Sequence, residues 1–131
     1  MKRFRNKPQI TRTEALNCRP IKNTEVLEVV LETGELLLTY PVKVRPWVAG
    51  LARRFGRRLQ QPAKKKLQLD ALGTAVWHLL DGHRTVRQVV HTFTRTQQLH
   101  PKEAEIAVAQ FVRELGRRGL IGLQQPHREG R

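Results

Sequence analysis

The sequence contains no serine and a single cysteine, Cys18. The first absence excludes a serine nucleophile, and one cysteine can form neither an internal disulfide nor a thiolate metal cage. A catalytic cysteine needs a base within hydrogen-bond reach, and no histidine lies near Cys18 in the sequence. The only two aspartates, Asp70 and Asp81, fall at the two ends of a predicted helix. These absences argue against an enzyme.

Metal-ligand spacings, phosphate loops and long apolar runs are also missing. No histidine pair has the His-Glu-x-x-His spacing of a metal site, and the glycines form no phosphate loop. We therefore expect no metal and no cofactor. The histidines are His78, His83, His91, His100 and His127. Without an apolar run of membrane-spanning length or a secretory signal, we expect a cytoplasmic protein.

Positive charge is abundant and unevenly spread. The formal net charge is +14, and residues 43–69 carry nine basic side chains and no acidic one. Residues 25–42, in contrast, carry four glutamates and no lysine or arginine. A basic excess of this size favours an anionic partner, such as nucleic acid, an acidic peptide or a lipid surface.

The stretch from Leu69 to Val90 predicts a helix, a tight turn and a second helix. Asp70 is a good N-cap, and Gly82 can take the left-handed conformation that ends a helix. Thr85 begins the next helix with Gln88 three residues later, as in a capping box. The expected core residues are Leu72, Ala75, Val76, Leu79 and Leu80 on the first helix, with Val86, Val89, Val90 and Phe93 on the second.

A third helix is predicted over His100–Arg118, with His100 as cap, Pro101 at the first helical position and Gly119 as the stop. Its core side consists of Ala104, Val108, Phe111, Val112 and Leu115. A second stripe lies nearly opposite and consists of Ile106, Ala109, Gln110, Arg113 and Arg117. An isoleucine and an alanine beside two arginines suit a partner that is part apolar and part acidic; a scattered surface isoleucine is the plain alternative.

A β-hairpin is predicted before these helices. Val26–Leu31 and Leu36–Tyr40 read as its strands. Leu27, Val29 and Leu31 would share one face and Glu28 and Glu32 the other, and Gly34 suits the turn. Lys64–Leu69 reads as a third short strand. Lysines are typical of an exposed sheet edge, although a solvated linker would also carry them.

The segment Pro46–Leu59 predicts an inserted amphipathic helix. Trp47, Leu51 and Phe55 share one side of its helical wheel, and arginines lie opposite and beside them. Such a helix suits a membrane surface or a partner, so peripheral membrane contact through Trp47–Leu59 is one interpretation. The other is an insertion that covers its own domain.

The hairpin, the run Leu67–Val86 with its helix-Asp-Gly-x-Arg-Thr-Val pattern, and the third helix together resemble the PqqD-like family. The resemblance is strongest over Leu67–Leu123 and looser over Val26–Tyr40. It implies an α+β fold: a winged helix-turn-helix with a small three-stranded antiparallel sheet and three helices. The inserted helix would lie between the second and third strands, where members of the family typically have a short turn.

The resemblance also implies a function. The family includes non-catalytic chaperones that bind the leader of a ribosomally made precursor peptide between the third strand and the third helix. They present it to a modifying enzyme, often a radical S-adenosylmethionine enzyme. On this chain the strand corresponds to Lys65–Leu69 and the helix to His100–Arg118. The expected peptide-binding residues are Lys65, Lys66, Leu67, Gln68, Leu69, Ile106, Ala109, Gln110, Arg113 and Arg117.

We accordingly expect a basic N-terminal arm over residues 1–25, a PqqD-like domain over residues 26–123 with an insertion over residues 42–63, and a frayed tail over residues 124–131. Within the arm, Thr13–Leu16 suits one helical turn, and residues 1–12 carry little to bury.

A nucleic-acid-binding winged helix is the alternative function. Gln110 and Arg113 are suitable for reading bases, and the arm and residues 43–69 are strongly basic. Glu103 and Glu105, however, would face phosphate repulsion if that end of the third helix entered a groove. The steep salt dependence of DNA binding would distinguish the two functions.

Reversal of charge at Arg113 and Arg117 tests the predicted third-helix stripe. We expect it to weaken peptide binding and to preserve the fold, because both side chains lie opposite the predicted core. Titration calorimetry measures the affinity, and an unchanged value would remove this stripe from the site.

Overall fold

The computed structural model describes residues 11–41 and 64–126 of the chain. They divide into two compact units, of which one is Thr24–Thr74 and the other combines the residues up to Asn23 with those from Ala75 onward. We call them the sheet unit and the helical unit and describe each by itself. Helices and strands in both confirm the α+β class.

The sheet unit contains the three-stranded antiparallel sheet expected from the sequence. Its strands are β2 (Leu27–Val30), β3 (Leu36–Pro41) and β4 (Lys64–Gln68), in the order β2-β3-β4. Gly34 takes a φ of 92° in the predicted turn, a conformation that glycine adopts without steric cost. The predicted hairpin and third strand are therefore confirmed, with β4 as an edge strand.

The apolar face predicted for β2 is not the buried face of the sheet. Leu36, Leu38 and Tyr40 of β3 are buried, whereas Leu27 and Val29 of β2 are 59% and 48% exposed. Pairing of Val29 with Leu37 places the exposed β2 residues on the face opposite Leu36 and Leu38. The alternation along β2 identified residues that share a face, but that face is open to solvent.

Thr74 joins the sheet to the first turns of α3 (Ala71–Leu79) within the sheet unit. Its Oγ1 accepts a hydrogen bond from the N–H of Leu36 at 3.1 Å, and both residues are buried. Asp70 caps the same helix, because its Oδ1 accepts a hydrogen bond from the N–H of Gly73 at 2.7 Å. Asp70 thus has the capping role that the sequence predicts.

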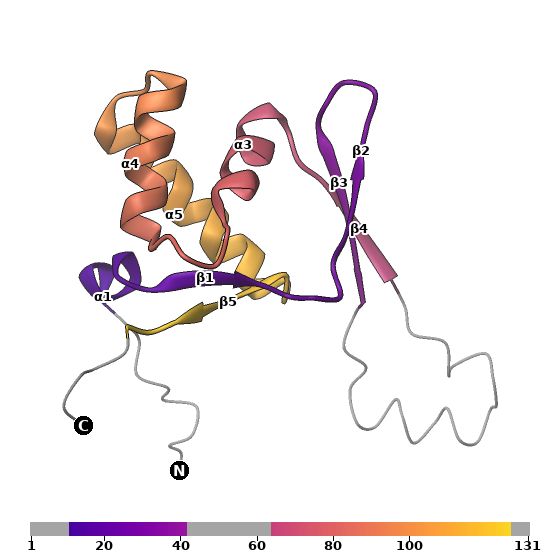
Figure 1. Cartoon of the computed structure of the whole chain (residues 1–131), viewed down its shortest axis with the longest axis horizontal. Helices are drawn as coiled ribbons and strands as arrows, with labels where there is room; N and C mark the ends of the chain where they lie inside the picture. Colours follow the sequence, from indigo (N-terminus) through magenta and orange to yellow (C-terminus); the bar gives the residue numbers. More distant parts are fainter. Residues whose placement is uncertain (1–10, 42–63, 127–131) are drawn as a thin grey trace, which may run out of the picture. The chain divides into compact units, whose positions relative to one another are not determined.

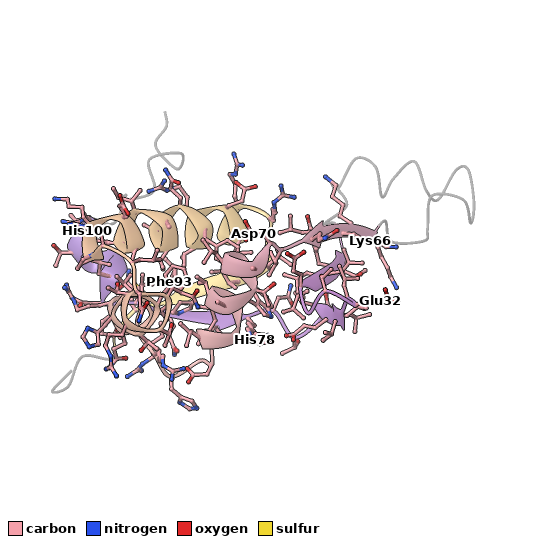
Figure 2. All side chains as sticks on the ribbon, turned by 90° about the horizontal axis from the view of Figure 1, so that it is seen from above. Glu32, Lys66, Asp70, His78, Phe93 and His100 are labelled. Atoms are coloured by element: carbon pink, nitrogen blue, oxygen red, sulfur yellow. The ribbon has the colours of Figure 1, made fainter. Side chains whose placement is uncertain are left out.

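The helical unit contains the end of α3 together with α4 (Val86–Gln97) and α5 (Pro101–Arg117), which pack against each other (Figure 1). Thr85 and Gln88 form the predicted capping box of α4. The Nδ1 of His100, at the beginning of α5 in Figure 2, accepts a hydrogen bond from the N–H of Lys102. The predicted beginnings of these two helices are therefore confirmed.

Asp81 organises the turn between α3 and α4. Its Oδ1 accepts hydrogen bonds from the N–H groups of His83 at 2.9 Å and Arg84 at 3.0 Å, and its Oδ2 accepts one from Arg84 Nη1. The two main-chain hydrogen bonds lower the pKa of the Asp81 carboxyl. Gly82 follows with a φ of 83°. The residues of the Asp-Gly-x-Arg part of the sequence pattern therefore form this hydrogen-bonded turn.

Two elements of the helical unit come from the predicted N-terminal arm. Residues 12–16 form α1 (Arg12–Leu16), which confirms the expected helical turn, and residues 19–22 form β1 (Arg19–Lys22), which the sequence did not suggest. β1 pairs with β5 (Ile121–Gln124) in a two-stranded antiparallel sheet, seen side by side in Figure 1. The described residues thus contain α1 in addition to the three helices expected for the domain, and β1 and β5 in addition to its three strands.

The burial of α3 differs from prediction at one position in each unit. In the helical unit, Trp77 is fully buried although the predicted core face does not include it, and in the sheet unit Leu72 is 47% exposed although that face includes it. Lys22 Nζ lies 4.5 Å from the centroid of the Trp77 ring, so the indole also takes part in a cation–π contact. Val76, Leu80, Val89 and Phe93 are buried as predicted.

Several predictions fall outside the described residues, namely the inserted helix Pro46–Leu59, the beginning of the arm and the end of the tail. In the part of the chain that is described, no helix combines the length and the apolar character required to cross a membrane.

The hydroxyl of Thr74 yields a test of the sheet unit. Thr74→Val leaves the buried N–H of Leu36 without an acceptor, so we expect the free energy of unfolding to fall by about 1–3 kcal/mol. Thr33→Val is the matched control, because Thr33 Oγ1 accepts from the exposed N–H of Glu35 and water can replace it. Urea denaturation measures both, and equal losses would contradict this role of Thr74.

Candidate functional site

An apolar groove of about 810 Å³ lies on the helical unit between α1, α5 and β5. Its volume is within the range of about 300–1,000 Å³ that is usual for small-ligand sites. Leu16, Val86, Val112 and Ile121 line it and are buried, so they form its floor. Such a floor suits apolar side chains of a partner.

The walls of the groove leave apolar surface accessible. Ile106 of α5 is 52% exposed, and Leu123 of β5 is 38% exposed. Ala109 is less exposed than both and lines the same groove. Gly116 and Gly122 also line it, and a Cβ atom built on either glycine meets no atom within 4 Å. The groove is therefore open beside both glycines.

Contacts at both ends of α1 hold it beside α5 and α4. A salt bridge joins Arg12 of α1 to Glu105 of α5. Just after the helix, Cys18 C=O accepts a hydrogen bond from the N–H of Val86 at 2.9 Å, and Cys18 Sγ donates to Glu14 C=O. Because α1 is only five residues long, these contacts rather than helix propensity fix the α1 wall of the groove.

The charges around the groove are mainly positive. Arg12, Lys102 and Arg113 line it together with one acidic residue, Glu105, which is paired with Arg12. Lys102 and Arg113 are exposed and form no ion pair with any described residue. A bound segment with carboxylates would therefore find two available cations beside the apolar floor.

The structure brings together four of the five predicted α5 residues. Ile106, Ala109, Gln110 and Arg113 all line the groove, as the second stripe predicts. Arg117 does not line it, because its guanidinium donates to Glu114, which also accepts from Arg118 at 2.7 Å. These two hydrogen bonds lower the pKa of the Glu114 carboxyl. Arg117 is thus engaged by its own helix.

The predicted strand residues lie in the sheet unit along β4 and just after it. The exposed residues include Lys65, Lys66 and Gln68; Leu67 is half-buried and Leu69 is buried. Lys66 is labelled in Figure 2. Leu69 is therefore part of the core of its unit, and the other four residues expose at least part of their side chains.

Alternate residues of β4 direct their main-chain groups away from β3. Leu69 donates its N–H to Leu36 C=O at 2.8 Å, so the opposed pair Leu36–Leu69 is hydrogen-bonded. In an antiparallel ladder such pairs alternate with pairs that are not bonded. Lys66 and Gln68 belong to the second kind, and β4 pairs with no other described strand. Their N–H and C=O groups therefore form an open edge.

Cys18 and the histidines are side chains that could take part in catalysis. Cys18 is buried, and desolvation raises the pKa of its thiol, which disfavours the nucleophilic thiolate. His78 and His83 are exposed. Among the described residues, no three histidine, cysteine or acidic side chains come together as a metal site.

Sequence reasoning predicted a helical turn at Thr13–Leu16 and an extended piece at Leu120–Leu123, but not that both border a groove. The pairing of the extended piece with β1 was not foreseen either. The signals were present but short: Thr11 and Glu14 form a capping box, and Pro20 and Ile21 sit in a four-residue strand. A run of four residues does not by itself indicate a strand. The strand that pairs with β1 lies about 100 residues further along the chain.

Comparison with known families finds a match over the second half of the chain. A family model described as Coenzyme PQQ synthesis protein D (PqqD) matches residues 56–121, half of the chain. The match includes β4, α3, α4 and α5, and it excludes α1, β1, β2, β3 and nearly all of β5. No curated protein matches the chain.

The groove glycine of α5 provides a stability test. Gly116→Ala adds a methyl group to open space and lowers the entropy of the unfolded chain, so we expect the free energy of unfolding to rise by about 0.5–1 kcal/mol. Gly119→Ala is the matched control, because its φ of 81° disfavours alanine by about 1 kcal/mol. Urea denaturation measures both; destabilisation by Gly116→Ala would contradict an open groove.

Proposed function

Because the chain belongs to the PqqD family, we propose that it is a non-catalytic chaperone that binds the leader of a ribosomally made precursor peptide. The chaperone presents the bound precursor to a modifying enzyme. The family match supports a peptide-binding accessory role of this kind in the synthesis of modified peptides. The chemistry then belongs to the enzyme, and the chaperone itself needs no cofactor.

The observation that carries the proposal is the open edge of β4. Lys66 and Gln68 direct main-chain donors and acceptors away from β3. An extended peptide can pair with such groups as an additional strand, and its alternate side chains then give specificity. This edge lies within the matched residues 56–121, so a family function can be assigned to it.

The charges on β4 and on α5 suit an acidic leader. β4 exposes Lys64, Lys65 and Lys66, and α5 presents Arg113 beside the apolar side chains of Ile106 and Ala109. We propose that the domain is a winged helix-turn-helix. We also propose that the leader contacts both its third strand and its third helix. Lysines alone would attract many anions, so main-chain pairing is the more specific element.

A radical S-adenosylmethionine enzyme is the partner that we propose for the loaded chaperone, and the cytoplasm is its expected location. The nucleic-acid alternative gains no support from the family match. The first turn of α5 also carries Glu103, which is exposed and would repel phosphate. The proposed membrane contact concerns Trp47–Leu59, which lies outside the described residues.

Lys66→Pro tests strand addition directly. Proline removes the outward N–H and places a ring on the open edge, but the bonds of Leu67 to Leu38 remain. Peptides of 20 residues are first selected from a random display library on the wild-type chain, and their affinities are then measured by titration calorimetry. We expect Lys66→Pro to weaken them at least tenfold, about 1.4 kcal/mol.

Lys66→Ala is the matched control, because it removes the same charge and keeps the N–H. We expect it to weaken binding several-fold less than Lys66→Pro. Thermal unfolding followed by circular dichroism verifies that both variants fold. Equal affinity of wild type and Lys66→Pro, or a library that yields no binder, would refute peptide addition at β4.

A further inference from the structure

The groove between α1, α5 and β5 has a main-chain edge of its own. Asn23 donates its N–H to Leu120 C=O at 2.9 Å, which makes Asn23–Leu120 a hydrogen-bonded pair. Pairs then alternate along the strands, so Ile121 and Leu123 direct their N–H and C=O groups away from β1. Both residues line the groove. An apolar floor and an open strand edge thus meet at β5.

The two outer edges of this small sheet are not equivalent. On β1, the position opposite Leu123 is Pro20, which has no N–H to offer an added strand. Proline is one of the devices that protect an exposed edge from pairing with another chain. β5 contains no proline, and among the described strands it pairs with β1 alone. The sequence therefore protects one edge of this sheet and leaves the other able to pair.

We propose that the groove is a second peptide-anchoring site, which binds an extended segment of the precursor along β5. The proposal rests on the proposed function, because that function makes a peptide the partner. The site is built by the helical unit alone, and α1 together with nearly all of β5 lies outside the family-matched residues. It therefore shares Ile106, Ala109 and Arg113 of α5 with the proposed leader contact, and it adds main-chain pairing along β5 to the strand addition at β4.

The chemistry of the groove determines the kind of segment. In an added strand, successive side chains point to opposite faces, so every second side chain would enter the floor of Leu16, Val112 and Ile121. The intervening side chains would meet the rim, where Lys102 and Arg113 are exposed. The segment therefore alternates aliphatic residues with aspartate or glutamate. A concave groove of this size suits a single extended chain better than the convex surface of a folded enzyme.

Two synthetic probes test the site without knowledge of the precursor. One is the fluorescein-labelled, capped hexapeptide Leu-Glu-Leu-Glu-Leu-Glu, and the other replaces each glutamate by lysine. Fluorescence anisotropy with the full chain measures both affinities. We expect the glutamate probe to bind at least tenfold more tightly than the lysine probe, and Arg113→Glu to remove most of this preference. Equal binding of the two probes, or no binding of the glutamate probe, would overturn the proposal.

Variants of the groove determine where the glutamate probe binds. Leu123→Pro removes the outward N–H of β5, and Gly116→Leu fills open space beside it; we expect each to weaken the probe at least tenfold. Leu123→Ala keeps the N–H and should weaken it less than Leu123→Pro. Ala107→Leu, on an exposed α5 position outside the groove, should leave the affinity unchanged. Undiminished binding by both Leu123→Pro and Gly116→Leu would overturn the site.

The same variants separate failure of this site from failure of the proposed function. Lys66→Pro should leave probe binding intact, because β4 belongs to the sheet unit. Library peptides selected on the wild-type chain should lose affinity on Gly116→Leu as well as on Lys66→Pro. If they respond only to Lys66→Pro, peptide addition at β4 stands, and the proposal that the groove binds the precursor is overturned.

Discussion

Main-chain hydrogen-bonding groups at the edge of a small sheet are the constraint on which the proposed function depends. A strand that pairs on one side only presents a row of donors and acceptors that either meet water or pair with another chain. In this protein the register of β3 and β4 decides which groups those are, because Leu69 bonds to Leu36 and thereby turns the groups of Lys66 and Gln68 outward. In the proposed complex, charge and apolar contacts would add selectivity to this pairing.

Register in turn depends on contacts within each unit. In the sheet unit, Thr74 satisfies the buried N–H of Leu36 at the point where β3 begins, and Gly34 allows the turn that aligns β2 with β3. In the helical unit, the pairing of β1 with β5 joins segments about 100 residues apart, and the Asn23–Leu120 bond sets its register. Small shifts at these points would exchange inward and outward groups along a whole edge.

The sequence predicted local features well because their causes are local. Caps at Asp70, Thr85 and His100, and the glycine turns at Gly34 and Gly82, depend on residues within three or four positions of each other. The α5 stripe was also recognisable, since helical spacing alone places Ile106, Ala109, Gln110 and Arg113 together.

Features that depend on distant partners were missed. Strand β1 has four residues and becomes a strand only by pairing with β5, so neither its existence nor the groove beside it could be read from local pattern. The exposure of Leu27 and Val29 and the burial of Trp77 likewise depend on which face meets the core. Arg117 fits the helical stripe by spacing, but Glu114 three residues earlier engages it.

Amide hydrogen exchange of β4, followed by NMR on the full chain with and without a library-selected peptide, tests strand addition most directly. If the peptide pairs with the open edge, its carbonyl groups accept hydrogen bonds from Lys66 and Gln68, and the exchange of these two amides slows by at least tenfold. The amide of Leu67, already bonded within the sheet, should change much less. Unchanged exchange at both Lys66 and Gln68 in the saturated complex would contradict peptide addition at this edge.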